Sequence, residues 1–304
     1  MSQTLTEPTA IHPPSPEAPG VSPRKEAKRV LLRSRADKAT AKQNMASERF
    51  RPTGSKRGHG CQPVGLHPSV AALKVKLFAD GADKAGMVGL SRNPLIRGFT
   101  TNPTLMRKAG VRDYRAFARE ILQAIPDRSI SFEVFADEFP QMERQALEIA
   151  SWGEQVYVKI PITNTRQEPS NDLVERLARR GVKLNITAIT TLEQVRSISA
   201  ALADGPSSYV SVFAGRIADT GRDPVPLMAE AVEILRPYPN LELLWASPRE
   251  LLNVFQADAI GCHIITATPD VLKKLSLVGK DLEEFSLDTV RMFYEDARKA
   301  GYSL

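Results

Sequence analysis

The sequence predicts an α/β protein with a single (β/α)8 barrel, also called a TIM barrel, over residues 71–304. Eight short apolar segments alternate with amphipathic segments over about 230 residues, which is the count and length that this barrel requires. No glycine-rich G-x-G-x-x-G turn follows a strand, as it would in an open nucleotide-binding sheet. We therefore expect a closed barrel with a C-terminal helix, preceded by a disordered basic tail over residues 1–70.

The predicted strands are short runs rich in β-branched and aromatic residues. They cover residues 75–80, 98–101, 129–133, 156–161, 182–187, 209–213, 241–245 and 262–266. The predicted helices carry apolar residues at the three- and four-residue spacing of one helix face. They cover residues 114–125, 138–152, 170–180, 192–202, 224–235, 248–256, 269–275 and 282–299.

The N-terminal 70 residues differ from the rest in composition. They contain nine of the 22 prolines and little apolar periodicity, which predicts disorder. They also hold 12 of the 41 basic and 5 of the 35 acidic residues, so the tail carries +7 and the remainder −1. Because the positive charge belongs to the tail, we expect no nucleic acid to bind the barrel.

Three interpretations of this tail stay open. It could be a solvated extension, an artefact of an upstream start with Met45 as the true first residue, or an arm that binds a partner or membrane surface through its Lys and Arg side chains. Nucleic-acid binding by the tail would show a strong salt dependence. The early prolines and scattered acidic residues disfavour a transit peptide.

The remaining composition indicates a cytoplasmic protein without a membrane span. No run approaches the 18 or so apolar residues of a span, and residues 1–20 lack the apolar core of a signal peptide. The cysteines, Cys61 and Cys262, form neither a disulfide framework nor a metal-spaced cluster, which favours a reducing compartment. The four histidines show no metal-ligand spacing, and His263 is expected to be a hydrogen-bonded core or strand-end residue.

Lys159 lies inside the apolar strand 156–161, which reads Val-Tyr-Val-Lys-Ile-Pro. A buried lysine is unfavourable unless it is paired with an acceptor or used as an amine. Desolvation favours the free amine, which can attack a carbonyl group to form a Schiff base. For this strand alone, a lysine that extends to solvent at the strand end is the simpler interpretation.

Seven consecutive predicted strands end at or just before a polar residue. Active sites of (β/α)8 barrels form at these C-terminal strand ends. The residues are Asp80, Asn102, Glu133, Lys159, Asn185, Thr187, Ser211, Arg216, Ser247 and Arg249. One such residue would be an ordinary loop entry, whereas seven strands in succession predict a polar pocket that holds the lysine and two carboxylates.

The two carboxylates can supply the proton transfers that a Schiff-base enzyme needs. Asp80 and Glu133 could assist both the loss of water from a carbinolamine and the breaking of a carbon–carbon bond. A structural role is the alternative for each residue, since a carboxylate can pair with an arginine and a strand-end serine or threonine can cap the next helix.

The other polar residues suit a sugar phosphate. The side chains of Asn102 and Asn185 both donate and accept hydrogen bonds, as sugar hydroxyl groups require. Arg216 and Arg249, together with Ser247, suit a phosphate group because a planar guanidinium binds it through two parallel hydrogen bonds.

Six segments resemble the transaldolase family and occur in the same order on the same strands. They are F-A-D (78–80), T-T-N-P-T-L (100–105), V-K-I-P (158–161), N-I-T (185–187), S-V-F-A-G-R-I-A-D (211–219) and A-S-P-R (246–249). The resemblance extends from about residue 75 to the C-terminus and excludes the tail. The sequence departs from the family pattern at Gly81, Thr104, Val212 and Pro248.

The resemblance implies class I aldol chemistry on sugar phosphates, without a metal or an organic cofactor. Lys159 would bind the ketose carbonyl carbon as a Schiff base, and Asp80 would accept the proton of the C4 hydroxyl group. Glu133 and Thr187 would hold the catalytic water. The dihydroxyacetone portion would be bound by Asn102, Asn185 and Ser211, and the phosphate by Arg216, Ser247 and Arg249.

The resemblance leaves two activities open. A transaldolase passes the three-carbon unit of sedoheptulose 7-phosphate or fructose 6-phosphate to an aldose phosphate, whereas a fructose 6-phosphate aldolase releases dihydroxyacetone. Glu133 and Phe213 resemble the transaldolases, since the aldolases resemble Gln and Tyr at these positions. Both residues favour transfer. A diverged barrel that acts as a scaffold is disfavoured because the lysine and both carboxylates are present.

The expected partners are sugar-phosphate substrates and further copies of this chain. Small members of the family assemble into rings, which implies a homo-oligomer. The predicted helix 282–299 offers a set of apolar side chains to its own barrel or to a neighbouring subunit: Phe285, Leu287, Val290, Phe293 and Tyr294.

Overall fold

The computed structural model describes residues 68–304. The chain divides into two units, Met1–Pro63 and Val64–Leu304, and the description below concerns the second unit from residue 68 onward. The predicted disordered tail therefore lies outside the described residues except for residues 68–70, which belong to helix α2 (Pro68–Ala71). The predicted domain boundary at residue 70 stays a prediction.

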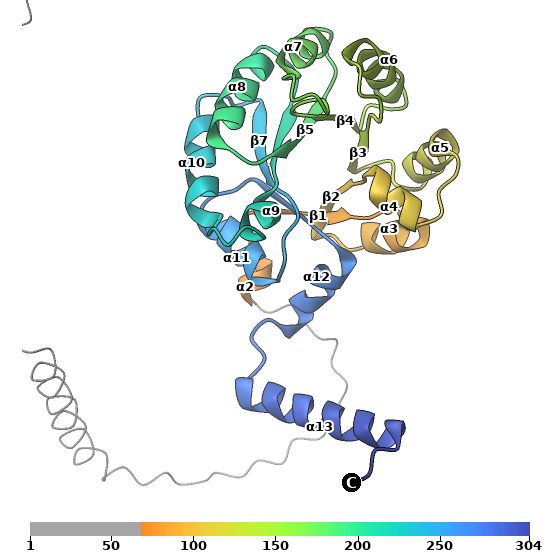
Figure 1. Cartoon of the computed structure of the whole chain (residues 1–304), viewed down its shortest axis with the longest axis vertical. Helices are drawn as coiled ribbons and strands as arrows, with labels where there is room; N and C mark the ends of the chain where they lie inside the picture. Colours follow the sequence, from red (N-terminus) through yellow and green to blue (C-terminus); the bar gives the residue numbers. More distant parts are fainter. Residues whose placement is uncertain (1–67) are drawn as a thin grey trace, which may run out of the picture. The chain divides into compact units, whose positions relative to one another are not determined.

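Eight parallel strands of the described chain form a closed barrel in sequence order (Figure 1). They are β1 (Lys76–Asp80), β2 (Ile96–Thr100), β3 (Ser129–Glu133), β4 (Val156–Pro161), β5 (Leu184–Ile189), β6 (Ser208–Val212), β7 (Leu241–Trp245) and β8 (Ile264–Ala267). Strand β8 pairs in parallel with β1, from Lys76↔Ile264 to Ala79↔Ala267, and so closes the barrel. The predicted (β/α)8 barrel is confirmed.

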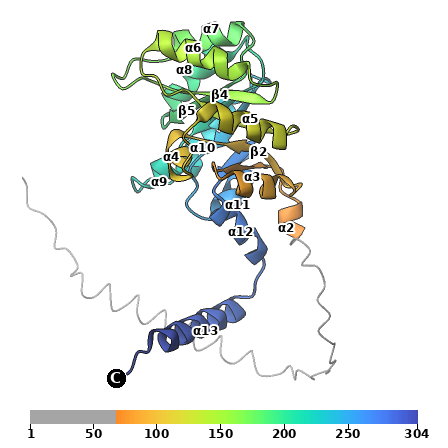
Figure 2. The ribbon, with the colours of Figure 1, turned by 90° about the vertical axis from the view of Figure 1, so that its right-hand side faces the viewer.

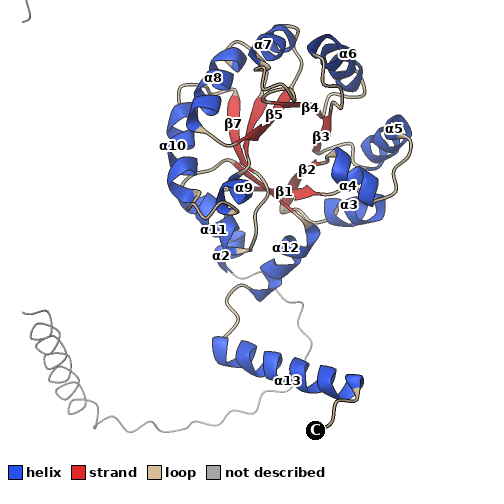
Figure 3. Cartoon of the chain, viewed as in Figure 1, coloured by secondary structure: helices blue, strands red, loops and turns tan. Residues whose placement is uncertain are grey.

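Helices surround the strands on the outside of the barrel (Figures 2 and 3). They are α3 (Lys84–Ser91), α4 (Pro103–Lys108), α5 (Tyr114–Ala124), α6 (Phe139–Ala150), α7 (Asn171–Arg179), α8 (Leu192–Leu202), α9 (Ala214–Ala218), α10 (Val225–Leu235), α11 (Leu252–Ala259) and α12 (Pro269–Lys273). A 3₁₀ turn, η1 (Lys274–Leu277), and the C-terminal helix α13 (Leu282–Ala300) follow. None of the helices in residues 68–304 is long and apolar enough to cross a membrane.

Four helices of the structure, α2, α3, α4 and α9, were not predicted from the sequence. Helices α4 and α9 have six and five residues, which is too short to display a helical period. Helix α3 contains two glycines, which lower its helix propensity. Side-chain caps start two of them, since Asp83 accepts from the Gly86 N–H and Asn102 accepts from the Leu105 N–H.

Most predicted elements differ from the structure only at their ends. Helix α11 starts at Leu252, although the sequence predicted residue 248. The reason is that Asn253 Oδ1 accepts hydrogen bonds from the N–H groups of Arg249 and Glu250, which holds this segment as a turn. His263 precedes β8, and its Nδ1 accepts the Leu243 N–H at 3.0 Å, as expected of a hydrogen-bonded strand-end residue.

The two-residue period of the strands separates two cores. On β4, Val156, Val158 and Ile160 belong to the large cluster between the barrel and the helices. Tyr157 belongs to a second cluster, in which it stacks on Tyr209 with ring centroids 4.0 Å apart. The other members of this second cluster are Phe78, Leu244, Ala246 and Ile264. Inward side chains of successive strands therefore fill the barrel interior and form a floor beneath its C-terminal end.

Helix α13 covers the predicted residues 282–299 but buries none of its side chains. Phe285, Val290, Phe293 and Tyr294 are 45%, 59%, 63% and 64% exposed. The apolar face predicted for this helix therefore does not pack on the barrel of its own chain.

Gly98 provides space for the aromatic floor, and we predict that Gly98→Ala destabilises the barrel. An added Cβ would lie 2.6 Å from the Phe78 ring and 2.5 Å from Ser129 Oγ. Overpacking of this kind costs about 1–3 kcal/mol. Urea unfolding should show a lower midpoint.

The matched control is Gly89→Ala in helix α3, where an added Cβ meets no atom within 4 Å. This variant should keep or raise the wild-type stability, by about 1 kcal/mol at most. Equal midpoints for the two variants would contradict the close packing at Gly98.

Candidate active site

A cavity of about 360 Å³ lies at the C-terminal ends of the barrel strands. The structure brings together ten of the predicted site residues in its wall: Asp80, Asn102, Glu133, Lys159, Asn185, Thr187, Ser211, Phe213, Arg216 and Ser247. Side chains alternate between the two faces of a strand, so every second residue points into the barrel. The inward side chains at the C-terminal ends of neighbouring strands therefore meet in one place.

The Lys159 amine is buried and held by two acceptors. The residue is only 6% exposed, so the side chain does not extend to solvent. Its Nζ donates a hydrogen bond of 2.8 Å to the Thr101 carbonyl oxygen and lies 3.1 Å from Glu133 Oε2. The two acceptors come from neighbouring strands and fix the amine in the wall of the cavity.

Asp80 occupies an environment suited to proton transfer. Burial raises the pKa of its carboxyl group, and the nearby Glu133 charge adds to this rise. The charge of Lys159 and a hydrogen bond of 2.8 Å from Thr100 Oγ1 oppose it. Thr100 Oγ1 also lies 2.6 Å from Thr266 Oγ1, so two threonines orient the carboxylate. A carboxylate with a raised pKa is a stronger proton acceptor than a solvated one.

A buried hydrogen-bond chain fixes the amide of Asn185. Its Nδ2 donates to Ser131 Oγ at 3.0 Å, and its Oδ1 accepts from Ser211 Oγ at 2.6 Å. Thr187, two residues further along β5, has a buried Oγ1 without a hydrogen-bond partner among the described residues. This hydroxyl group lines the same cavity as Glu133 and is available to a bound water or substrate.

Arg216, in the short helix α9 after β6, and Ser247, in the turn after β7, both line the cavity. Ser247 has a φ of 58°, in the left-handed region. At Gly215 an added Cβ would lie 1.5 Å from the Ser247 carbonyl oxygen, so only glycine allows these two backbones to approach so closely. The close approach brings a guanidinium and a hydroxyl group to one side of the cavity.

Arg249 is the predicted site residue that does not line this cavity. Its Nε donates to Asp219 Oδ1 at 2.8 Å, and its Nη2 forms an ion pair with the same carboxylate. It lines a separate cavity of about 380 Å³, between the turn after β6 and helix α11. Its phosphate-binding role stays a prediction.

The sequence of the barrel matches one family over almost its whole length. Residues 77–304 match the family model described as Transaldolase/Fructose-6-phosphate aldolase. The chain belongs to this family.

Curated relatives agree with this membership. A "Probable transaldolase" of Thermoanaerobacter sp. is 34% identical over 231 residues, which are 76% of this chain and 100% of that protein. A second "Probable transaldolase", from Methanococcus maripaludis, is 34% identical over 218 residues, which are 70% of this chain and 97% of that protein. These names indicate an enzyme of the transaldolase or aldolase type.

Among solved structures, CutC from Streptococcus agalactiae superposes with a TM-score of 0.50 at 13% sequence identity. The match covers 64% of this chain and 98% of CutC. At this identity the likeness concerns the barrel fold alone.

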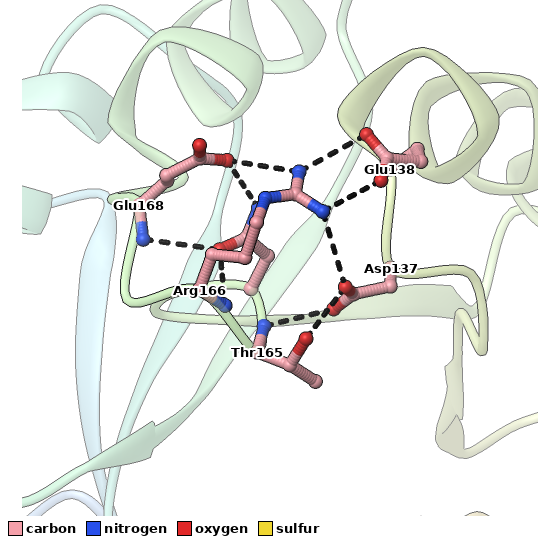
Figure 4. Close-up of polar contacts among 6 residues, drawn as sticks. Asp137, Glu138, Thr165, Arg166 and Glu168 are labelled. Atoms are coloured by element: carbon pink, nitrogen blue, oxygen red, sulfur yellow. Dashed lines mark hydrogen bonds and ion pairs between the residues drawn. The ribbon is translucent and has the colours of Figure 1, made fainter.

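A network of charged residues connects the loop after β3 with the loop after β4 (Figure 4). Arg166, in the loop after β4, donates to both carboxylate oxygens of Glu138, in the loop after β3, at 2.7 and 3.0 Å. Arg166 also donates to Glu168 at 3.1 Å, and Asp137 accepts from the N–H and hydroxyl groups of Thr165. The network links the two loops that follow the Glu133 and Lys159 strands.

Several site residues were missed at the sequence level. Thr100 and Thr266 occupy inward strand positions, two residues from a neighbouring inward side chain, so the strand period could have found them. No pattern in the sequence predicts the roles of the Thr101 carbonyl group or of the Arg166 network. No group of three His, Cys, Asp or Glu side chains in residues 68–304 could hold a metal ion.

The raised pKa of Asp80 predicts a pH-dependent stability that Asp80→Asn removes. The folded state holds this proton more tightly than the unfolded state, so the free energy of unfolding falls as pH rises through and above the ordinary value of 3.8. The variant should lose catalytic activity. Its unfolding midpoint should fall less than that of the wild type as the pH rises above the ordinary pKa of 3.8.

The matched control is Asp137→Asn, because hydrogen bonds from Thr165 lower the pKa of this exposed carboxyl group. The sign is then opposite, and the variant should lose a stabilising contribution that is present at neutral pH and disappears in acid. If the unfolding midpoints of Asp80→Asn and of the wild type change equally with pH, the burial of Asp80 does not cause the pH dependence of stability.

Proposed function

We propose that this protein is a transaldolase, which transfers a dihydroxyacetone unit from a ketose phosphate to an aldose phosphate through a Schiff base on Lys159. The observation that carries this proposal is the buried Lys159 amine, 3.1 Å from Glu133 in a cavity that Asp80 also lines. Membership of the family supports the reaction type.

The first half of the reaction joins the ketose to the enzyme. Glu133 first accepts a proton from the Lys159 ammonium, 3.1 Å away. The free Nζ then attacks the C2 carbonyl carbon of sedoheptulose 7-phosphate or fructose 6-phosphate and gives a carbinolamine. Glu133 donates a proton to the leaving hydroxyl group, which departs as water, and the iminium forms. The free hydroxyl group of Thr187 and the Glu133 carboxylate hold this water for the later hydrolysis.

Carbon–carbon cleavage then depends on Asp80. Its carboxylate accepts the proton of the C4 hydroxyl group, the C3–C4 bond breaks, and its electron pair moves toward the iminium nitrogen to form an enamine. An aldose phosphate leaves. An acceptor aldose phosphate takes its place, the enamine carbon attacks its aldehyde, and Asp80 returns the proton. Water then hydrolyses the new iminium and releases the product ketose.

The cavity wall supplies the contacts that the substrate needs. Asn102, Asn185 and Ser211 bind the hydroxyl groups of the dihydroxyacetone portion. Arg216 and Ser247 bind the phosphate through charge-assisted hydrogen bonds. Arg249 could join them only if its ion pair with Asp219 opened.

Transfer is favoured over release by the nature of the cavity wall. Phe213 lines the cavity with a ring that has no hydroxyl group to position a water molecule. A fructose 6-phosphate aldolase that releases dihydroxyacetone, and a non-catalytic scaffold, are the alternative outcomes of the experiment below.

The proposal predicts a covalent adduct on Lys159. Borohydride treatment in the presence of fructose 6-phosphate should increase the intact mass by one reduced dihydroxyacetone unit in the wild type, whereas Lys159→Ala should remain unmodified. The control is Lys183→Ala, which removes a half-buried lysine outside the cavity that donates to the Glu154 carbonyl and should leave the adduct unchanged. An adduct in Lys159→Ala would exclude this lysine, and no adduct in the wild type would favour the scaffold.

The products then distinguish transfer from release. With fructose 6-phosphate and erythrose 4-phosphate together, a transaldolase forms sedoheptulose 7-phosphate and little free dihydroxyacetone. Free dihydroxyacetone formed at the same rate without an acceptor would identify an aldolase instead.

We also propose that α13 packs on a second copy of this chain, which makes the enzyme a homo-oligomer. The helix has 19 residues, none of them buried, and exposes its aromatic and aliphatic side chains. Large apolar side chains that gather on one helix and stay exposed indicate an interaction site.

Light scattering should accordingly give a mass that is a multiple of 33.4 kDa. The double substitution Phe285→Asp and Phe293→Asp should lower the mass to that of the monomer, because buried charges oppose association. The exposed control Lys299→Ala, on the same helix, should leave the mass unchanged. A monomeric wild type would refute the proposal.

A further inference from the structure

The hydroxyl group of Tyr114 makes two hydrogen bonds with the backbone of Glu133. It accepts from the Glu133 N–H at 2.8 Å and donates to the Glu133 carbonyl oxygen at 2.9 Å. Tyr114 is the first residue of α5 and does not line the catalytic cavity. A side chain from a helix thus satisfies both backbone groups at the last residue of β3.

The pairing of β2 with β3 explains why the backbone of Glu133 needs a side-chain partner. The pairs run from Gly98↔Ser129 to Thr100↔Ser131, and the Thr101 N–H donates to the Ser131 carbonyl oxygen at 3.1 Å. In a continued parallel ladder, the Glu133 N–H would bond to Thr101, and residue 103 would donate to the Glu133 carbonyl. Residue 103 is a proline and has no N–H group, so the second bond cannot form.

Because the Tyr114 hydroxyl group takes the place of these two ladder hydrogen bonds, one backbone acceptor is left free. The Thr101 carbonyl oxygen, which the Glu133 N–H would otherwise occupy, accepts the Lys159 amine at 2.8 Å. The same hydroxyl group fixes the peptide that carries the Glu133 carboxylate, 3.1 Å from that amine. Both partners of the lysine therefore depend on Tyr114.

The surroundings of Tyr114 hold its ring in place and keep its hydroxyl protonated. The ring meets Phe132 and Phe135 edge-on, with centroids 6.2 and 5.7 Å apart, and it tilts against Trp152 at 5.8 Å. Burial raises the pKa of the hydroxyl group, so it remains a donor at neutral pH. The ring packing does not require the hydroxyl group, which makes its two hydrogen bonds separable from the fold.

We propose that Tyr114 is a positioning residue for the Lys159–Glu133 pair, acting through the main chain of Glu133. The catalytic part of this inference rests on the proposed Schiff-base function. Without the hydroxyl group, the Glu133 N–H has no acceptor other than the Thr101 carbonyl. It then competes with the Lys159 amine for that oxygen, and the amine and the carboxylate both shift.

The test is Tyr114→Phe, which keeps the ring and removes only the hydroxyl group. Displacement of catalytic groups should lower kcat and the rate of borohydride trapping about ten- to a hundredfold. The KM for fructose 6-phosphate should stay within about twofold, because the sugar and phosphate contacts are elsewhere in the cavity. The control is Tyr238→Phe, in the loop before β7 at the opposite end of the strands, which should change neither quantity.

A readout without any sugar separates this inference from the proposed function. Reductive methylation with formaldehyde, followed by peptide mass spectrometry, measures the reactivity of the Lys159 amine itself. Tyr114→Phe should change the methylation rate of Lys159 about threefold or more, relative to Lys183 in the same sample. If this rate changes while the wild type forms no adduct with fructose 6-phosphate, the positioning role stands and the proposed function fails.

The inference is overturned if Tyr114→Phe only lowers the unfolding midpoint. In that case kcat and Lys159 methylation, both measured well below the midpoint, would equal the wild-type values. Such a result would give the hydroxyl group a purely structural role.

Discussion

The burial of a single amine imposes the main constraint on this barrel. A lysine that is only 6% exposed needs acceptors for its amine, and Lys159 obtains them from the Thr101 carbonyl and the Glu133 carboxylate. In a regular parallel sheet a strand carbonyl such as that of Thr101 belongs to the ladder and is not available. The barrel therefore interrupts one ladder at the point where the buried amine needs an acceptor, and the missing N–H of Pro103 is part of that interruption.

The floor of the cavity complements this constraint. Aromatic rings of Phe78, Tyr157 and Tyr209 fill the barrel interior below the polar residues. They exclude water from beneath the amine, so the charged groups above interact in a medium of low dielectric constant, where each hydrogen bond is stronger than in water. The raised pKa of Asp80 reflects the same desolvation. One packing arrangement thus both stabilises the barrel and adjusts the basicity of a carboxylate.

Much of this arrangement could be predicted from the sequence because it follows the strand period. Strands β3, β4 and β7 have the predicted bounds, and the inward positions at their ends predicted a shared pocket. The two-residue period of a strand does not predict which residues from other parts of the chain become hydrogen-bond or ion-pair partners. Arg249 pairs with Asp219 on the basis of its turn geometry, and Tyr114 reaches Glu133 from a helix 19 residues earlier in the chain. Short helices such as α9 are set by the strand ends that flank them and show no helical period.

The position of α13 in the chain has a consequence for synthesis. The apolar side chains of this helix follow all eight strands, so they leave the ribosome after the residues that close the barrel between β8 and β1. Barrels that are still incomplete, with unpaired strand edges, do not yet carry the exposed aromatic face. If α13 forms the proposed contact between copies, an unfinished chain does not yet carry the helix through which it would associate.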